Sequence, residues 1–305
     1  MAQQPKLTVS GYRGIWGETL TAEIAQRYAC AFACFVQETR NTHPTLLIAR
    51  DGRESGLEIK HAIIETLISK GIQVIDGDIL PTPTVLFAVR TEKYDGAIII
   101  TASHNPIEYN GLKFVTHTAL FTNEDEVANI QKRYGENKNT ETIEKGTVTE
   151  NTTLGQEHIS EIITHINSEK IRARKFKVAV DMINASACVL DPLLFEALGV
   201  ELIPLNNIPN GKFAHKPEPL RENLADIAQL VKESGADIGF AQDPDADRLV
   251  VIDRYGEIIS EEYANLKLQE YKDGQIEFNE LNSRCEGLTQ EIKRLNVDRK
   301  EMLMN

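Results

Sequence analysis

Thr101–Pro106 combines a hydroxyl nucleophile with polar neighbours at the end of an apolar run. Gly96–Ile100 directly precedes it, and its β-branched residues predict a buried strand. In open α/β sheets, ligands collect at the carboxyl ends of such strands. Ser103 therefore stands where a nucleophile or a phosphate carrier would act. Ser, Asn and Pro are also common turn formers, so this segment alone favours an ordinary turn.

A second segment, Asp243–Arg248, carries carboxylates at its first, third and fifth positions. In an extended backbone this period of two points all three to one side, an arrangement that a cation would stabilise. Oxygen-only ligands favour a hard ion, Mg²⁺ or Ca²⁺. An EF-hand is excluded, because its loop needs Gly and Glu where this chain has Arg248 and Arg254. A haloacid-dehalogenase-type phosphatase also fits poorly, since its aspartate pair usually opens a domain, and carboxylates solvated in a turn are the plain alternative.

Together the two loops predict phosphoryl chemistry. Ser103 would carry or accept a phosphoryl group, and a Mg²⁺ held by the aspartates would neutralise charge on its oxygens. Arg13, Lys113 and Arg248 would add positive potential.

Strands alternate with helices along most of the chain, which predicts an α/β protein of two α/β/α sandwich domains with mixed, largely parallel sheets. Residues 1–150 would form the domain with the serine loop, and residues 151–265 the domain with the aspartate loop. The polar segment 136–151 lacks apolar periodicity and is predicted to connect them. Asn110–Gly111 is a turn signal that would return Leu112–Val115 as a hairpin strand.

Composition limits the partners and the location. The net charge of −13 argues against nucleic acid and anionic membranes as partners. No apolar run is long enough to span a bilayer, and the first residues lack the apolar core of a signal peptide. Four cysteines without paired spacing do not indicate a disulfide scaffold. We therefore expect a cytoplasmic protein.

The chain resembles the α-D-phosphohexomutase family, which includes phosphoglucomutase/phosphomannomutase and phosphoglucosamine mutase. The likeness covers about residues 7–265 and rests on five segments in order: Gly11–Gly14, Arg50–Arg53, Thr101–Pro106, Asn110–Phe114 and Asp243–Arg248. It implies an intramolecular phosphotransferase that interconverts hexose 1-phosphate and hexose 6-phosphate. Its partner would be a phosphorylated hexose, and hexose 1,6-bisphosphate would serve as intermediate and activator.

The same resemblance implies roles for individual residues. Ser103 would be the phosphoserine and would complete the site of one Mg²⁺ with Asp243, Asp245 and Asp247. Arg13 and Lys113 would contact the phosphoserine. His104 and Asn105 would shape its loop, and Arg248 would support proton transfer or the metal loop.

Two departures from the family pattern stand out. Asn184–Ala187 occupies the place where family members commonly have Asn-Gly-x-Gly. Family enzymes also continue with a third domain that reads sugar hydroxyls and a fourth that clamps phosphate, and neither motif occurs in this sequence. We therefore expect impaired mutase turnover from this chain, with phosphoglucosamine mutase as the alternative within the family.

From about Leu266 the family pattern stops. Apolar residues at heptad spacing predict a long helix or about three heptads of coiled coil over 266–305, through which the chain would form a homo-oligomer. A single helix folded back onto the second domain explains the same pattern. A non-catalytic binding or scaffold protein that oligomerises through this tail is the alternative function of another class.

Overall fold

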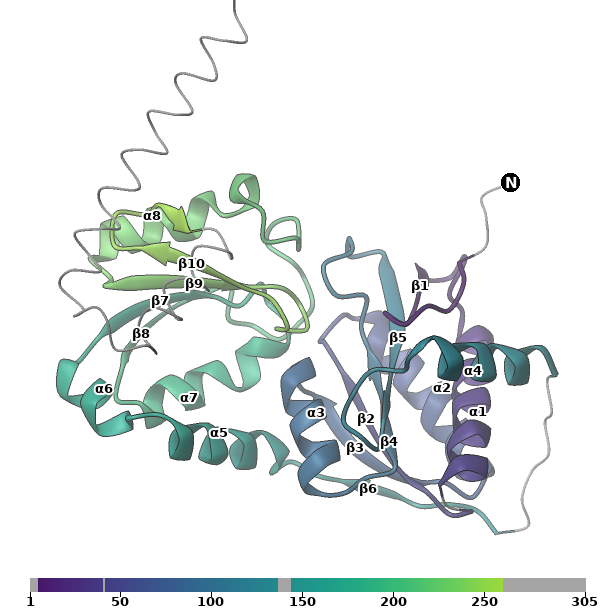
Figure 1. Cartoon of the computed structure of the whole chain (residues 1–305). Coiled ribbons are helices and arrows are strands. Elements are labelled where there is room, and N and C mark those ends of the chain that lie inside the picture. The colour runs from purple at the N-terminus through teal and green to yellow at the C-terminus, as the bar shows by residue number, and fades with distance from the viewer. Residues whose placement is uncertain (1–4, 41, 137–143, 260–305) are drawn as a thin grey trace, which may run out of the picture. The chain divides into compact units, whose positions relative to one another are not determined.

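The structure, a computed structural model, describes residues 5–40, 42–136 and 144–259 (Figure 1). The predicted tail, residues 266–305, lies outside these ranges. The described residues up to Ile258 belong to one contact unit that contains two sheets, each flanked by helices. The two predicted α/β sandwiches are therefore confirmed, whereas domain boundaries near residues 150 and 265 stay predictions.

The first sheet holds six strands in the order β1-β5-β4-β2-β3-β6. The pairs β2–β3, β2–β4 and β3–β6 are parallel, and β5 is antiparallel to β4 and β1, so the sheet is mixed and largely parallel as expected. The strands are Tyr12–Ile15 (β1), Thr45–Arg50 (β2), Gln73–Ile79 (β3), Gly96–Ile100 (β4), Tyr109–Thr116 (β5) and Val148–Glu150 (β6). The flanking helices are Ala22–Thr39 (α1), Ser55–Ser69 (α2), Thr82–Thr91 (α3) and Glu124–Glu136 (α4).

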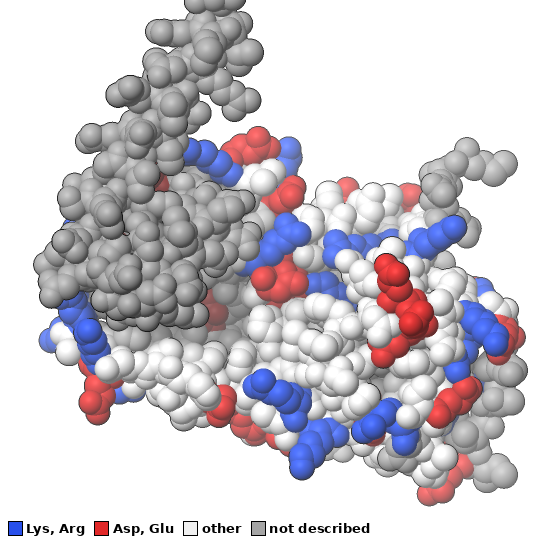
Figure 2. Space-filling model, in the orientation of Figure 1, with Lys and Arg blue, Asp and Glu red and all other residues white. Residues whose placement is uncertain are grey.

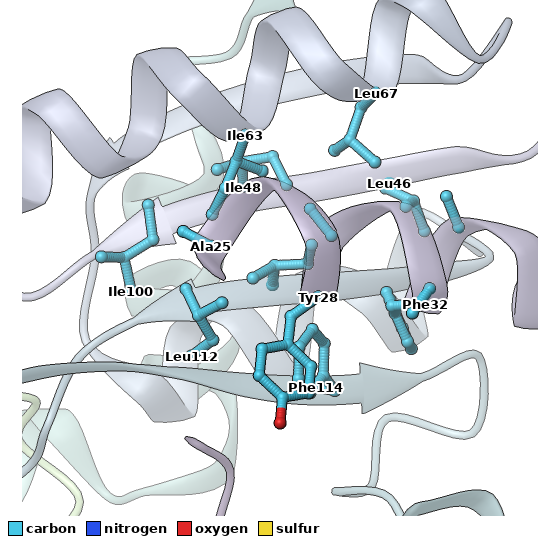
Figure 3. Packing of buried hydrophobic residues seen from close by; sticks show 14 of the residues in the cluster. Ala25, Tyr28, Phe32, Leu46, Ile48, Ile63, Leu67, Ile100, Leu112 and Phe114 are labelled. Carbon is cyan, nitrogen blue, oxygen red and sulfur yellow. The ribbon is translucent and has the colours of Figure 1, made fainter. Parts of the chain in front are cut away.

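Alternate residues of β2 divide between the two faces of this sheet. Leu46 and Ile48 belong to the core built with α1, α2 and α4, whereas Leu47 and Ala49 pack with α3. Figure 3 shows Leu46 and Ile48 among side chains of α1 and α2. Both faces of β2 are thus buried, which is the usual state of a parallel strand and explains its continuous apolar sequence.

The second sheet holds five strands in the order β11-β10-β9-β7-β8. Strand β7 is parallel to β8 and β9, while β10 is antiparallel to β9. The strands are Lys177–Asp181 (β7), Glu201–Leu205 (β8), Ile238–Gln242 (β9), Leu249–Asp253 (β10) and Ile258–Ile259 (β11). The helices are Leu154–His165 (α5), Ser168–Arg174 (α6), Asp191–Ala197 (α7) and Ala225–Ser234 (α8), with short 3₁₀ turns at Ser186–Val189 and Arg221–Asn223.

The predicted turn at Asn110–Gly111 is wrong, because both residues lie inside β5. Gly111 pairs with Arg13 of β1, and a Cβ at Gly111 would lie only 2.5 Å from the Tyr12 carbonyl oxygen. The glycine therefore permits a close approach of backbones. The predicted return strand is confirmed, since residues 112–115 pair antiparallel with β4.

Two short elements differ from the sequence expectation. Part of the polar connection 136–151 forms β6, which adds an edge strand beside β3. Helix α6 was not predicted, and it begins with Asn167 accepting a hydrogen bond from the Lys170 N–H. Polar capping residues rather than an apolar stripe define this helix, so periodicity did not reveal it.

The described surface carries charges of both signs. On the face in Figure 2, Lys and Arg side chains lie interspersed with Asp and Glu among uncharged residues. None of the helices in the described ranges combines the length and the apolar composition that a membrane crossing requires.

Candidate active site

The serine loop and the aspartate loop meet in the structure. The Ser103 loop follows β4, and the loop from Asp243 follows β9, 140 residues further along the chain. Ser103 Oγ donates a hydrogen bond of 2.9 Å to Asp243 Oδ2, and both side chains are buried. Two strand ends, which the sequence singled out separately, therefore deliver a hydroxyl and a carboxylate to one place.

Ser103 has an unusual backbone conformation. Its φ of +51° lies in the left-handed region, which costs a residue with a Cβ on the order of 1 kcal/mol or more. Its N–H donates to Thr101 Oγ1 at 2.8 Å, and that hydroxyl donates to Asp51 Oδ2 at 2.7 Å. The fold thus holds the loop in a conformation that the isolated segment would seldom adopt.

Arg53 lies beneath this loop and is fully buried. Its guanidinium donates to the carbonyl oxygens of Ser103 (2.7 Å), Asn105 (2.8 Å) and Pro106 (2.8 Å). Nε donates to Asp51 Oδ2 at 3.0 Å, so the buried cation has a carboxylate partner. Burial raises the pKa of Asp51, while the charge of Arg53 opposes that rise.

The aspartate loop is a turn and not the extended segment that the sequence suggested. Ala246 has a φ of +53°, and its N–H donates to the Asp243 carbonyl oxygen. Asp243 Oδ1 accepts from the N–H groups of Asp247 (3.2 Å) and Arg248 (3.1 Å). The turn still gathers the carboxylates, because one oxygen each of Asp243, Asp245 and Asp247 lie within 4.8 Å of one another.

Groups of the first sandwich neutralise part of this charge. Lys113 of β5 donates to Asp245 Oδ2 at 2.6 Å and to Asp247 Oδ2 at 2.8 Å. Thr82 at the start of α3 donates its hydroxyl to Asp245 Oδ2 at 2.7 Å and its N–H to the Asp245 carbonyl oxygen at 2.9 Å. Asp245 is thereby held at both its side chain and its backbone by residues more than 130 positions away.

The pKa shifts follow from burial and from these charges. Burial would lower the pKa of Lys113, but the carboxylates of Asp245 and Asp247 outweigh it and raise that pKa. Burial would raise the pKa of Asp245, but the Lys113 ammonium outweighs it and lowers that pKa. Burial together with the charges of Asp245 and Asp247 raises the pKa of Asp243.

The donor set fits a hard divalent cation. All the candidate ligands are oxygens: the three carboxylates and the neighbouring Ser103 hydroxyl. Asp245 Oδ1 is buried, and among the described residues it has no hydrogen-bond partner. A buried carboxylate oxygen left unpaired in this way is costly, and coordination of Mg²⁺ or Ca²⁺ would satisfy it.

The other residues expected at the site take different positions around Ser103. Arg13 Nη1 donates to Asn105 Oδ1 at 2.9 Å, and burial lowers the pKa of Arg13. His104 Nδ1 lies 3.2 Å from Ser103 Oγ, and burial lowers the pKa of His104. Arg248 contributes its backbone N–H to Asp243, whereas its side chain is exposed.

Sequence reasoning missed two residues that hold the site. Arg53 stood in a recognised segment, Arg50–Arg53, but without a role, since a basic loop is often solvated. Thr82 carried only the signal of a threonine at a helix start, and its partner Asp245 lies 163 residues away. Neither contact follows from local pattern, because both depend on which strand ends become neighbours.

The turn at Asn184–Ala187, where the expected glycines are missing, forms without them. Positive φ falls on Ile183 (+47°) and Asn184 (+55°), whereas Ala185 has a φ of −128°. Ser186 donates its N–H (3.2 Å) and its hydroxyl (2.8 Å) to the Pro244 carbonyl oxygen. The segment 184–187 therefore supports the aspartate loop although it lacks the expected glycines.

Comparison with known proteins finds two family matches. Residues 5–141 match "Phosphoglucomutase/phosphomannomutase, alpha/beta/alpha domain I" and residues 156–256 match the corresponding domain II. Among curated relatives, the chain is 36% identical over 255 residues to a phosphoglucomutase/phosphomannomutase of Thermococcus kodakarensis, covering 82% of this chain and 55% of that protein. It is 32% identical over 274 residues to a probable phosphoglucosamine mutase of Pyrococcus furiosus, covering 88% of this chain and 58% of that protein.

A crystal structure of a family protein from Burkholderia thailandensis is similar to this one. The TM-score is 0.73 at 33% sequence identity, over 85% of this chain and 57% of that chain. The chain thus spans about half the length of the curated relatives it matches.

Proposed function

Because this chain belongs to the phosphoglucomutase/phosphomannomutase family, we propose that it interconverts hexose 1-phosphate and hexose 6-phosphate through a phosphorylated Ser103. The observation that carries the proposal is the hydrogen bond of 2.9 Å between Ser103 Oγ and Asp243 Oδ2. It brings a hydroxyl nucleophile to a cluster of carboxylates that fits a divalent cation.

The residues around Ser103 have different roles in the proposed phosphoryl transfer. Asp243 Oδ2, which accepts the hydrogen bond of the Ser103 hydroxyl, would take up the proton that this hydroxyl loses when its oxygen attacks phosphorus, and would return it to the hexose oxygen that leaves phosphorus. Arg13 and Lys113 place positive charge beside the loop, which stabilises the negative charge on the oxygens of the transferred phosphoryl group. When bound by Asp243, Asp245 and Asp247, Mg²⁺ supplies further charge neutralisation to those oxygens.

A phosphorylated hexose is the substrate class that this proposal implies. The relatives that support it carry two kinds of name, phosphoglucomutase/phosphomannomutase and phosphoglucosamine mutase. An amino sugar phosphate is therefore the second candidate substrate, and hexose 1,6-bisphosphate is the phosphoryl donor to Ser103 in both cases.

Phosphoryl uptake tests the proposal directly. The chain is incubated with Mg²⁺ and glucose 1,6-bisphosphate, and the intact mass is followed for the wild type, Ser103→Ala and Ser160→Ala. Ser160 is an exposed serine on α5 and serves as the matched control. We expect the wild type and the control to gain one phosphoryl group and Ser103→Ala to gain none. A wild type that stays unmodified, or a Ser103→Ala protein that is modified equally, would contradict the proposal.

A further inference from the structure

Arg53 donates most of its hydrogen bonds to backbone carbonyl oxygens, and neutralising Asp51 does not require these bonds. A guanidinium has five N–H groups in a rigid planar fork. In Arg53, one contacts Asp51 and three contact the carbonyl oxygens of Ser103, Asn105 and Pro106. A side chain that only neutralised Asp51 would need no contact with three carbonyls of a single loop.

Those carbonyls belong to the segment that must hold a strained conformation. Ser103 has a positive φ, and such a backbone persists only where surrounding contacts hold it. The carbonyls of residues 103, 105 and 106 converge on one guanidinium, so Arg53 fixes the loop from both sides of His104. The direction of Ser103 Oγ toward Asp243 depends on that backbone.

A loop of the second sandwich packs against the same guanidinium. The ring of Phe213 lies 4.7 Å from the Arg53 guanidinium carbon, at cation–π distance. Gly211, with a φ of +68°, packs so closely that a Cβ there would lie 2.4 Å from the Gly52 carbonyl oxygen. Arg53 is therefore excluded from solvent, where its bonds to the loop are stronger than they would be in water.

We propose that Arg53 is a positioning residue for phosphoryl transfer, which holds residues 103–106 so that Ser103 Oγ faces Asp243. The inference rests on the proposed function of Ser103 as phosphate carrier. Arg53 touches neither the reacting oxygen nor the aspartates 243, 245 and 247 in the contacts of the described residues, so it acts through the loop backbone.

Arg53→Lys separates positioning from charge balance. Lysine keeps a positive charge beside Asp51 but lacks the planar fork that reaches three carbonyls. Arg50→Lys is the matched control, because Arg50 lies in the same segment and pairs with the half-exposed Asp78. If Arg53→Lys does not fold, the pair Asp51→Asn with Arg53→Gln replaces it, since that pair removes both buried charges together.

Three measurements decide the proposal. The rate of Ser103 phosphorylation by glucose 1,6-bisphosphate, taken per folded molecule, should fall on the order of 100-fold in Arg53→Lys, because small misplacements of reacting groups cost that much. Amide hydrogen exchange of residues 101–106 should become faster. Mg²⁺ affinity, measured by calorimetry, should stay near the wild-type value, and Arg50→Lys should resemble the wild type throughout.

A folded Arg53→Lys protein with wild-type phosphorylation and unchanged exchange of residues 101–106 would overturn the proposal. A purely structural role would lower the melting temperature and the folded fraction but leave the rate per folded molecule unchanged, which also overturns it. Exchange does not require phosphoryl transfer. It therefore still decides the role of Arg53 if the wild type takes up no phosphate, a result that would contradict the proposed function alone.

Discussion

The two loops that form the site are held by different kinds of contact. The Ser103 loop is fastened from within its own sandwich, by Arg53, Asp51 and Thr101. In the aspartate loop, Ser186 of the same sandwich holds the Pro244 carbonyl oxygen, but the side-chain partners of Asp245 are Lys113 and Thr82 of the other sandwich. The Ser103 loop is thus held by residues of its own sandwich, whereas Asp245 in the aspartate loop depends on residues of the other sandwich.

This difference is also a difference in charge. Beneath the Ser103 loop, the single carboxylate of Asp51 meets the single guanidinium of Arg53. In the aspartate loop, the ammonium of Lys113 pairs with Asp245 and Asp247, two of the three clustered carboxylates. We therefore expect a divalent cation to stabilise the second loop and not the first, so that disruption of each loop responds differently to Mg²⁺.

The largest expected effect comes from removing the shared ammonium. Lys113→Met leaves Asp245 buried without its cationic partner, which we expect to lower the free energy of unfolding in EDTA by about 3–5 kcal/mol. Added Mg²⁺ should restore part of this loss, because it replaces the missing positive charge. Urea unfolding with and without Mg²⁺ measures both quantities.

Lys60→Met is the control for this experiment. Lys60 is also buried and also bridges two aspartates, Asp76 and Asp78, which lie outside the carboxylate cluster. Its loss should lower stability without recovery in Mg²⁺. Equal recovery of both variants would show that the aspartate loop has no special need for a cation.

The sequence predicted which strand ends would carry the site but not how the site is held. The apolar run before Thr101 predicted a buried strand whose end carries Ser103, and the structure has this strand. The aspartate segment likewise follows a strand, β9, which is buried at alternate residues. The same information could not reveal Thr82 or the carbonyl contacts of Arg53, since hydrogen-bond partners far apart in sequence become neighbours only in the folded chain.

Two sequence expectations failed because local preference was overridden by tertiary structure. Asn110–Gly111 is a strong turn signal, yet Gly111 is required inside a strand by the closeness of the Tyr12 and Thr101 carbonyl oxygens. Alternating aspartates suggested an extended segment, yet Ala246 takes a positive φ and the loop turns. In both cases the neighbouring chain decides the backbone conformation.

A smaller effect should come from the contact that joins the two sandwiches at Phe213. Its loop is anchored by His215, whose Nε2 lies 3.0 Å from Asp181 Oδ2 and whose Nδ1 lies 2.8 Å from the Lys216 carbonyl oxygen. Both partners are acceptors, so the ring donates to both of them only in its protonated, charged form. Burial would lower the pKa of His215, but Asp181, with a contribution from Asp226, raises it.

His215→Gln should therefore lower the free energy of unfolding by an amount that depends on pH. Because the folded pKa is raised, the stabilisation from His215 is fully present below its ordinary pKa of about 6.5 and disappears as pH rises through the folded value. We expect the variant to lose about 1.5–3 kcal/mol at low pH and progressively less at high pH. Urea unfolding of both proteins across this range measures the difference.

His165→Gln, at an exposed histidine of α5, controls for general effects of removing a histidine. A difference between wild type and His215→Gln that does not change with pH would show that the His215 ring is not charged in the folded protein. A neutral ring would still donate one of the two hydrogen bonds, so the Phe213 loop would be held without a charged contact between His215 and Asp181.

The smallest effect tests whether the aspartate loop depends on the first sandwich at a neutral contact as well. Thr82→Val keeps the shape of the side chain but removes the hydroxyl that donates to Asp245 Oδ2. That oxygen keeps its bond to Lys113, so the expected loss of stability is only about 1 kcal/mol. Hydrogen exchange should rise in residues 243–248 and stay unchanged in residues 101–106.

Thr84→Val is the matched control for this last comparison, because Thr84 lies on the same helix and its hydroxyl contacts His158 rather than the site. It should leave the exchange of both loops unchanged. If Thr82→Val instead accelerated the exchange of both loops, the Ser103 loop would not be held independently of the aspartate loop. The two loops would then form one cooperative unit, and the charge of the aspartates would help to hold the serine in place.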